Sequence, residues 1–232
     1  MPDDTSPATP RPADNDTTDN DTTDAGGDRY AGFPAGFFSR MDESSDAAFY
    51  VEPRLVTHID DDAIEAVRTC YDELGMHGEI LDLCSSWTSH LARRPQRLVV
   101  VGMNDEELAR NELAHERLVH DLNQQPELPF GDGGFDGAIC TVSVDYLIRP
   151  IEVFDEVARV LRPGAPFACT FSNRCFPTKV IRGWTAGDDD FHLQLVAEYF
   201  RRSQGWEQPR MEHRNPGRRG DPLFVVWART DR

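Results

Sequence analysis

The sequence predicts an α/β fold with a mostly parallel sheet of seven strands and helices on both faces. Short apolar segments that fit strands alternate along the chain with segments of helical apolar spacing. Some of the short segments, such as residues 98–101, are apolar at every position, which is typical of strands buried on both faces. Strands that alternate with helices favour parallel pairing, because each crossover helix returns the chain to the same end of the sheet.

The first helix and the first two strands are well marked. Ile64, Val67, Tyr71 and Leu74 recur at helical spacing, and the acids at 60–62 offer an N-cap and a favourably charged first turn. A helix over 63–74 is therefore expected, ended by Gly75. The apolar runs at 79–84 and 97–102 predict the first two strands.

The remaining elements follow the same alternation. A Pro-Gly pair at 163–164 ends one of the helices, and acids open two of them. In chain order we expect a helix at 104–111, strands at 117–122 and 134–142, a helix at 151–161, a strand at 166–171, a helix at 188–204, and strands at 211–215 and 223–228.

Charge and composition exclude some partners. The 232 residues include 41 acidic and 24 basic side chains, for a net charge of -17. A nucleic-acid partner is not expected, since phosphate binding needs a basic surface. Lys179 is the only lysine, and many acids with almost no lysine indicate adaptation to high salt, where close screening suppresses repulsion. The alternative is an ordinary acidic protein with an acidic tail.

The first 28 residues predict a disordered acidic tail. They carry eight acids, one arginine and almost no apolar side chains, so they cannot offset the entropy of ordering. Residues 29–232 are expected to form a single domain, with 29–59 as an irregular and helical approach segment. The odd set of five cysteines, without a Cys-x-x-Cys pair, favours a reduced, cytoplasmic compartment. Neither a signal peptide nor a membrane span is expected.

The loops after the parallel strands are where a ligand is expected. In an open parallel sheet, ligands bind beyond the carboxyl ends of the strands, where the strand order reverses. The loops that follow Cys84, Gly102, Leu122, Cys140 and Phe171 all contain small or polar residues. Each loop alone indicates little, because surface loops are commonly polar.

Four sequence segments together resemble a known family. They are Ile80-Leu81-Asp82-Leu83, then Val100 to Asn104, then Leu128-Pro129-Phe130 with Gly134-Phe135-Asp136, and then Glu156 to Gly164, which ends Arg-Val-Leu-Arg-Pro-Gly. In this order they resemble the signatures of class I S-adenosylmethionine-dependent methyltransferases of the small-molecule type. The resemblance covers residues 60–172. It implies a Rossmann-like methyltransferase fold, S-adenosyl-L-methionine as cofactor and a small-molecule substrate.

The resemblance also implies which residues bind the cofactor. Asp82 and the turn after it would lie against the methionine part, and Asn104 would face the ribose hydroxyls. Asp121 would accept a hydrogen bond from the adenine amine, and Thr141 would flank the methionine end. The implied cofactor-binding set is Asp82, Cys84, Ser85, Ser86, Asn104, Asp121, Leu122 and Thr141.

Two features depart from the family pattern. The first loop normally contains glycines, which adopt positive φ freely and let a ligand approach the backbone, but Cys84, Ser86 and Thr88 hold those positions here. Asn104 replaces the usual ribose-binding acid. An alternative is therefore a catalytically inactive binding or assembly module with this fold. A dinucleotide-binding dehydrogenase is disfavoured, because no Gly-x-Gly-x-x-Gly follows the first strand.

Candidate substrate residues come from the loop after the fifth strand and from the approach segment. Arg174 could pair with an anionic group, and its neighbours could orient the substrate. Methyl transfer mainly needs alignment, so no catalytic residue is implied. The histidines and cysteines show no metal-ligand spacing, and no metal is expected. The expected substrate pocket consists of Tyr50, Arg54, Tyr146, Asn173, Arg174 and Cys175.

Overall fold

The computed structural model describes residues 28–231, and the predicted tail lies outside them except for Asp28. The chain divides into two units, of which the first ends at Ala31. Within residues 28–31, a backbone hydrogen bond from Ala31 to Asp28 closes a turn. The second unit starts at Gly32 and contains the whole sheet.

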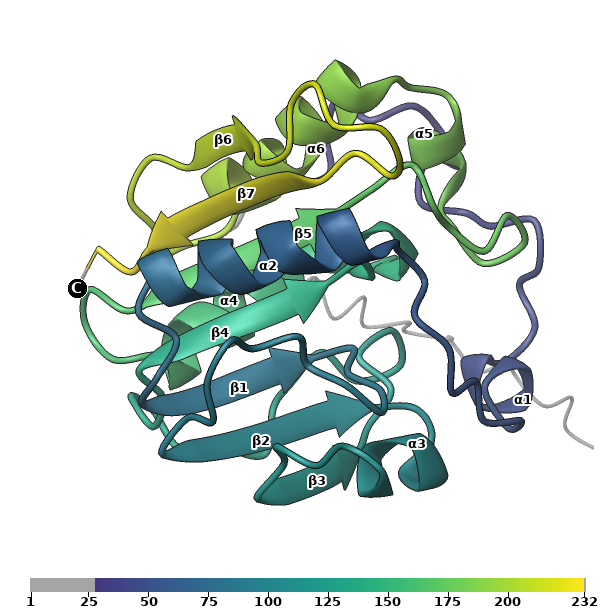
Figure 1. The fold of residues 1–232 in the computed structure, drawn as a ribbon. Helices are drawn as coiled ribbons and strands as arrows, with labels where there is room; N and C mark the ends of the chain where they lie inside the picture. Colours follow the sequence, from purple (N-terminus) through teal and green to yellow (C-terminus); the bar gives the residue numbers. More distant parts are fainter. Residues whose placement is uncertain (1–27, 232) are drawn as a thin grey trace, which may run out of the picture. The chain divides into compact units, whose positions relative to one another are not determined.

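The second unit is built on a mixed sheet of seven strands in the order β3-β2-β1-β4-β5-β7-β6 (Figure 1). β1 to β5 run parallel, whereas β7 pairs antiparallel with both β5 and β6. The order reverses between β1 and β4, which pair directly. The strands are β1 (Glu79–Leu83), β2 (Arg97–Gly102), β3 (Glu116–Val119), β4 (Gly137–Thr141), β5 (Pro166–Phe171), β6 (Arg210–His213) and β7 (Phe224–Arg229).

Helices cover both faces of this sheet, as predicted. Alternate strand residues face opposite sides, so Leu81 packs with α4 (Pro150–Val160) and α6 (Asp189–Arg202), while Ile80 packs with α2 (Asp61–Glu73). In Figure 1, α2 crosses one face and α4 lies on the other. The α2 N-cap is Asp60, whose side chain accepts a hydrogen bond from the Ala63 amide. The predicted fold class is thus confirmed.

Several boundaries differ from the sequence-based expectation. The third strand ends at Val119 rather than 122, so Asp121 and Leu122 lie in the loop that follows it. The fourth begins at Gly137 rather than 134, because Gly133 adopts a φ of 62° and Phe135 forms only an isolated bridge. The helix expected at 104–111 is α3, which spans only Asp105–Ala109.

Three short helices had no predicted boundaries, although helical structure was expected in the approach segment at 29–59, which contains the first of them. They are α1 (Asp46–Phe49), the 3₁₀ helix η1 (Val144–Tyr146) and α5 (Arg182–Thr185). Each spans only three or four residues, too few for an apolar period to be recognised. Within the approach segment, α1 lies beyond the edge of the sheet at which the parallel strands end (Figure 1). No helix among residues 28–231 is long and apolar enough to cross a membrane.

Candidate cofactor and substrate pocket

A pocket of about 320 Å³ lies at the carboxyl ends of β1, β2 and β3 and borders the end of β4, and the strand order reverses between β1 and β4. All eight predicted cofactor residues line it, and so do five of the six predicted substrate residues. Asn173 is the exception, since it is exposed and does not line the pocket. The five substrate-side residues are Tyr50, Arg54, Tyr146, Arg174 and Cys175.

The loop after β1 keeps a glycine-like turn without glycine. Cys84 adopts a φ of 51°, the left-handed conformation that glycine takes without strain. The next residue is tied to the sheet by its amide, which donates to the carbonyl of Val101 at 2.7 Å. The Ser85 hydroxyl donates to Asp82 at 2.7 Å. Side-chain hydroxyls therefore hold a turn that the family pattern assigns to glycines.

Asp82 lies on the floor of the pocket and is almost fully buried. Burial raises the pKa of its carboxyl group to about 7, although hydrogen bonds from Ser89 and Ser85 act in the opposite direction. Ser89 is itself buried and accepts a 2.8 Å hydrogen bond from the Asn111 side chain. A positively charged ligand group beside Asp82 would favour the ionised carboxylate.

Gly102 at the end of β2 brings the first loop close to the sheet. A Cβ atom built on Gly102 would overlap the carbonyl oxygen of Ser85. The neighbouring contact is the Leu108 side chain, 3.0 Å from the same position. Glycine is needed here for close approach of two backbone segments rather than for an unusual φ.

Asn104 and Glu107 occupy the pocket at the end of β2. The Asn104 side-chain oxygen caps α3 by accepting from the Glu107 amide at 3.0 Å, and its NH₂ donates to the carbonyls of Tyr50 and Val51. Both the oxygen and the NH₂ group of the Asn104 side chain therefore form hydrogen bonds within the protein. The carboxylate of Glu107 accepts 2.6 Å hydrogen bonds from the Ser86 hydroxyl and from the Arg54 amide.

Glu107 is the pocket carboxylate that the sequence analysis missed. It is buried and lines the pocket three residues beyond Asn104. Because Glu107 lies on α3, its carboxylate is near the end of β2, where the family pattern expects an acid. The available signal was the acid run at 105–107, which we interpreted only as favourable helix-start charge.

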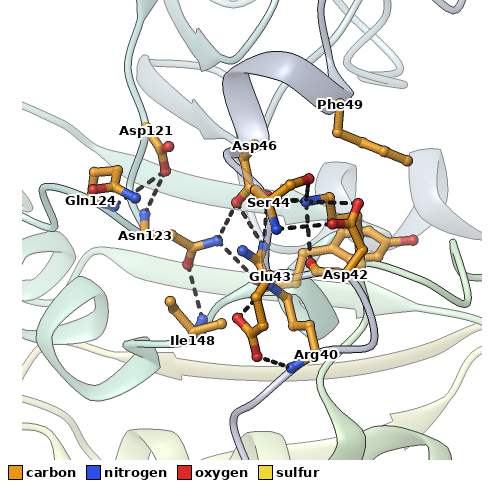
Figure 2. A network of polar contacts seen from close by, with 12 residues as sticks. Arg40, Asp42, Glu43, Ser44, Asp46, Phe49, Asp121, Asn123, Gln124 and Ile148 are labelled. Carbon is orange, nitrogen blue, oxygen red and sulfur yellow. Dashed lines mark hydrogen bonds and ion pairs between the residues drawn. The ribbon is translucent and has the colours of Figure 1, made fainter.

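At the end of β3, the loop of Asp121 is tied to the approach segment. The Asp121 carboxylate accepts hydrogen bonds from the amides of Asn123 and Gln124 at 2.9 and 3.2 Å. Asn123 in turn donates to the Asp46 carboxylate at 2.9 Å and accepts from the Ile148 amide (Figure 2). One carboxylate oxygen of Asp121 therefore stabilises the turn that follows it.

Asp46 on α1 is the centre of a buried polar network. Arg40 donates to both of its carboxylate oxygens, at 2.7 and 2.8 Å, as Figure 2 shows. Lys179, which is fully buried, lies 3.3 Å from Asp46 and 3.2 Å from Asp42. Burial opposes the charge of Asp46, but hydrogen bonds from Arg40 and Asn123 leave its pKa below the usual value. The network fastens the approach segment beside the pocket.

On the substrate side, Arg174 is already paired. Its Nε donates to Asp221 at 2.8 Å, although most of the side chain is exposed. Asp221 and Asp60 exchange hydrogen bonds through their amides and carboxylates. Arg174 therefore lines the rim and balances Asp221, rather than standing free for an anionic substrate.

Aromatic rings cluster around Phe176, which lines the pocket. Phe176 makes ring contacts with Phe49, Tyr146 and His58 at centroid distances of 5.2 to 5.8 Å. The amide of Phe176 donates to the Tyr146 hydroxyl at 2.7 Å. Burial raises the pKa of both Tyr50 and Tyr146, so their hydroxyls stay protonated.

Two histidines were not predicted to line the pocket. Burial lowers the pKa of His90 to about 4 and also lowers the pKa of His58. Both side chains are therefore neutral near pH 7, and His90 adopts a φ of 50°. No group of histidine, cysteine or acidic residues within the described part of the chain could hold a metal ion.

Residues behind the pocket are neutral as well. Thr141 exchanges a 2.7 Å hydrogen bond with the buried Tyr71 hydroxyl. The thiol of Cys84 hydrogen-bonds that of Cys140, and this contact with burial raises the pKa of Cys84 well above its usual value. Burial raises the pKa of Asp145, in η1, to about 8, and its Oδ2 has no hydrogen-bond partner among the described residues. Neither the thiols nor Asp145 is ionised in the folded protein near pH 7.

A model of the methyltransferase domain family matches residues 84–169, which include most of the pocket. A curated relative, the biotin biosynthesis bifunctional protein BioHC of Teredinibacter turnerae, is 40% identical over 47 residues. That segment is 20% of this chain and 8% of the relative, so the chain spans a small fraction of it.

Solved structures of low sequence identity share the fold. The putative methyltransferase in a complex with the Haloferax volcanii Trm112 methyltransferase activator superposes with a TM-score of 0.55 at 13% identity, over 74% of this chain and 91% of that one. A possible histamine N-methyltransferase of Thermotoga maritima gives a TM-score of 0.52 at 15% identity, over 73% and 89%. Residues 84–169 thus match the methyltransferase domain family, and the fold is the one found in S-adenosylmethionine-dependent methyltransferases of known structure.

Proposed function

We propose that this protein is an S-adenosylmethionine-dependent methyltransferase that acts on a small molecule. The observation that carries the proposal is a single pocket in which three strand ends and the approach segment converge. Its volume of about 320 Å³ is in the range of small-ligand sites, and both aromatic and acidic side chains line it. A small acceptor fits this enclosure better than a macromolecular surface does.

The pocket suits the cofactor that the family implies. S-adenosyl-L-methionine carries positive charge on its sulfonium and ammonium groups, and Asp82, Glu107 and Asp121 line the strand side of the pocket. Gly102 also lines the pocket and allows the loop after β1 to approach the end of β2 closely. We assign Asp82 and the 84–86 loop to the methionine part and Asp121 with Leu122 to the adenine. Glu107, whose neighbour Asn104 is committed elsewhere, is assigned to the ribose hydroxyls.

The cofactor supplies a methyl group on a positively charged sulfur, which a nucleophile accepts in one displacement. The protein's part is to align the two and to exclude water. The network around Asp46 holds the approach segment, which supplies Tyr50 and Arg54 to the pocket. Thr141 flanks the strand end with a hydroxyl oriented by Tyr71. His90, whose pKa is lowered to about 4 by burial, is only a weak base, so acceptors that are already nucleophilic near pH 7 are favoured.

The small-molecule assignment can be tested with radioactive methyl groups. The full chain is incubated with [methyl-³H]S-adenosylmethionine and a cell extract that has been separated into small molecules, protein and nucleic acid. We expect label only with the fraction that passes a membrane retaining macromolecules. Label that appears in protein or nucleic acid, and not in small molecules, would overturn this assignment.

An inactive binding or assembly module is not favoured by these observations. The loss of loop glycines was its motivation, but Cys84 still adopts the left-handed conformation and the serine hydroxyls anchor the turn. We further infer a reducing, cytoplasmic environment, supported by five cysteines that form no disulfide. Adaptation to high salt is supported by the single lysine being buried, which leaves arginine as the only strongly basic residue at the surface.

A further inference from the structure

Arg54 lines the pocket, and its guanidinium group lies among aromatic rings. The centre of its guanidinium group lies 4.5 Å from the ring centroid of Phe49, 5.5 Å from that of Phe176 and 5.6 Å from that of Tyr50. Such contacts with ring faces fix the orientation of the guanidinium, which loses little hydration energy because it is a weakly hydrated cation. The guanidinium is therefore held in place before any ligand arrives.

Hydrogen bonds complete this orientation and leave donors unused. One Nη donates to the carbonyl of Phe49 at 2.9 Å and the other to the carbonyl of Glu52 at 3.4 Å. A guanidinium has five N–H groups, so these two bonds leave about three of them. Among residues 28–231, no carboxylate forms an ion pair with Arg54, and yet it lines the pocket.

Two acids that line the pocket, Asp46 and Glu107, form their hydrogen bonds and ion pairs with groups other than the Arg54 guanidinium. Asp46 is bonded by Arg40, Lys179 and Asn123, while Glu107 receives the Ser86 hydroxyl and only the backbone amide of Arg54. The other cation at the rim, Arg174, is balanced by Asp221. Arg54 is thus the pocket cation that lacks an anionic partner.

Nearby side chains extend this donor surface. The Tyr146 hydroxyl accepts from the Phe176 amide, so its own hydrogen remains to be donated. Tyr50 also lines the pocket, and burial raises its pKa, so its hydroxyl stays protonated. Two phenols and a guanidinium favour a ligand group made of acceptors, and a planar carboxylate matches the geometry of a guanidinium with two parallel hydrogen bonds.

We propose that the methyl acceptor carries a carboxylate group and that Arg54, in its aromatic setting of Phe49, Tyr50 and Phe176, binds it. This inference rests on the proposed function and names the substrate class of the same site. The acids on the strand side then face the cationic cofactor, while Arg54 faces an anionic acceptor. Arg54 is a specificity-determining residue in this assignment and takes no part in proton transfer.

A carboxylate could also come from the methionine part of the cofactor, and the experiment separates the two sources. Calorimetry with the full chain measures the binding of S-adenosylhomocysteine and of 5′-methylthioadenosine, which lacks the amino-acid part. Benzoate and its neutral analogue benzamide are then titrated into the complex with saturating S-adenosylhomocysteine. The variants are Arg54→Gln, the charge-conserving Arg54→Lys, and Arg201→Gln as a control at an exposed, ion-paired arginine on α6.

We expect benzoate to bind the wild-type complex and benzamide not to bind. Arg54→Gln should weaken benzoate binding at least tenfold, Arg54→Lys should weaken it less, and Arg201→Gln should leave it unchanged. Binding of both adenosine compounds should persist in every variant, which also shows that the variants are folded.

Two results would overturn the inference alone. One is benzoate binding that is absent in the wild type or unchanged in Arg54→Gln. The other is a tenfold loss of S-adenosylhomocysteine affinity in Arg54→Gln without loss of 5′-methylthioadenosine affinity, which assigns Arg54 to the cofactor carboxylate. If neither adenosine compound binds the wild-type protein, the proposed function itself fails.

Discussion

The Ser86 hydroxyl donates a 2.6 Å hydrogen bond to the Glu107 carboxylate, and this contact joins the loop after β1 to the helix after β2. The partners are 21 residues apart in the chain and both line the pocket. Glu107 also accepts the amide hydrogen of Arg54 at 2.6 Å. One buried carboxylate on α3 therefore holds the loop after β1 and the approach segment together around the proposed ribose site.

Replacing Glu107 with Gln should weaken S-adenosylhomocysteine binding. A neutral amide accepts hydrogen bonds from ribose hydroxyls less strongly than a carboxylate does, and its NH₂ would face one of the two present donors, the Ser86 hydroxyl or the Arg54 amide. The loss should be about 1.5 to 3 kcal/mol, or roughly 10- to 150-fold in affinity. Calorimetric titration measures it.

The matched control for that change is Glu106→Gln. Glu106 is exposed on the same helix and pairs with Arg110 on the surface. Its replacement should leave affinity unchanged. Equal effects of the two substitutions would show that the charge of α3 matters rather than the carboxylate in the pocket.

Gly102→Ala should damage the loop after β1. The added methyl group would overlap the Ser85 carbonyl, and that backbone is fixed by its hydrogen bond to Val101. We expect a loss of about 1 to 3 kcal/mol in the free energy of unfolding and weaker binding of S-adenosylhomocysteine. Urea denaturation followed by circular dichroism gives the first quantity.

Gly131→Ala provides the comparison, since a Cβ on Gly131 meets nothing within 4 Å. That variant should be as stable as the wild type or slightly more stable, because alanine restricts the unfolded chain. If Gly102→Ala is equally harmless, the close approach of Ser85 to β2 does not shape the pocket.

Asp145 should make stability fall as the pH rises. Its pKa is raised by burial to about 8 in the folded protein, whereas an unfolded aspartate ionises near 4. Between these values the folded state holds a proton that the unfolded state has lost, so the cost of keeping Asp145 neutral grows with pH and levels off above about 8. Asp145→Asn removes this contribution to the pH dependence of stability.

The measurement for Asp145 is the difference in unfolding free energy between Asp145→Asn and wild type from pH 5 to 9. The difference should shift in favour of the variant by on the order of a few kcal/mol, and then become constant. A difference that does not change with pH would mean that Asp145 is ionised in the folded protein.

Salt should stabilise the folded protein. Residues 29–232 carry 33 acids and 23 basic side chains, or -10, and screening at molar KCl weakens their mutual repulsion. The melting temperature should therefore rise from 0.1 to 2 M KCl. A triple variant that neutralises Glu112, Glu127 and Glu207, which are exposed, should depend less on salt. A melting temperature that is flat or falling would count against adaptation to high salt.

The sequence was sufficient to predict the sheet, because its strands are marked by apolar runs that only burial on both faces explains. Leu81 and Val99 belong to one face and Ile80 and Val100 to the other, as strand alternation requires. The two glycine-marked boundaries, at 75 and at 163–164, were also predicted correctly. Local pattern and long-range packing agree in these segments.

The hydrogen-bond partners of the side chains at the site could not be predicted in this way. Asn104 was assigned to the ribose from its place after a strand, but it is bonded to the backbone of Tyr50 and Val51 more than 50 residues away. Arg174 was the candidate anion-binding residue until its partner Asp221, 47 residues later, was located. Such pairings depend on tertiary contacts between loops, and loops carry no periodic signal in sequence.

The central claim is that the three strand ends bind one cofactor, and calorimetric titration of the full chain with S-adenosylhomocysteine tests it most directly. We predict one site per chain, with affinity reduced by about 1 to 3 kcal/mol in Asp121→Ala, which removes an acceptor for the adenine amine. The absence of both heat and a melting shift at millimolar S-adenosylhomocysteine, in folded protein at its preferred salt concentration, would contradict the account.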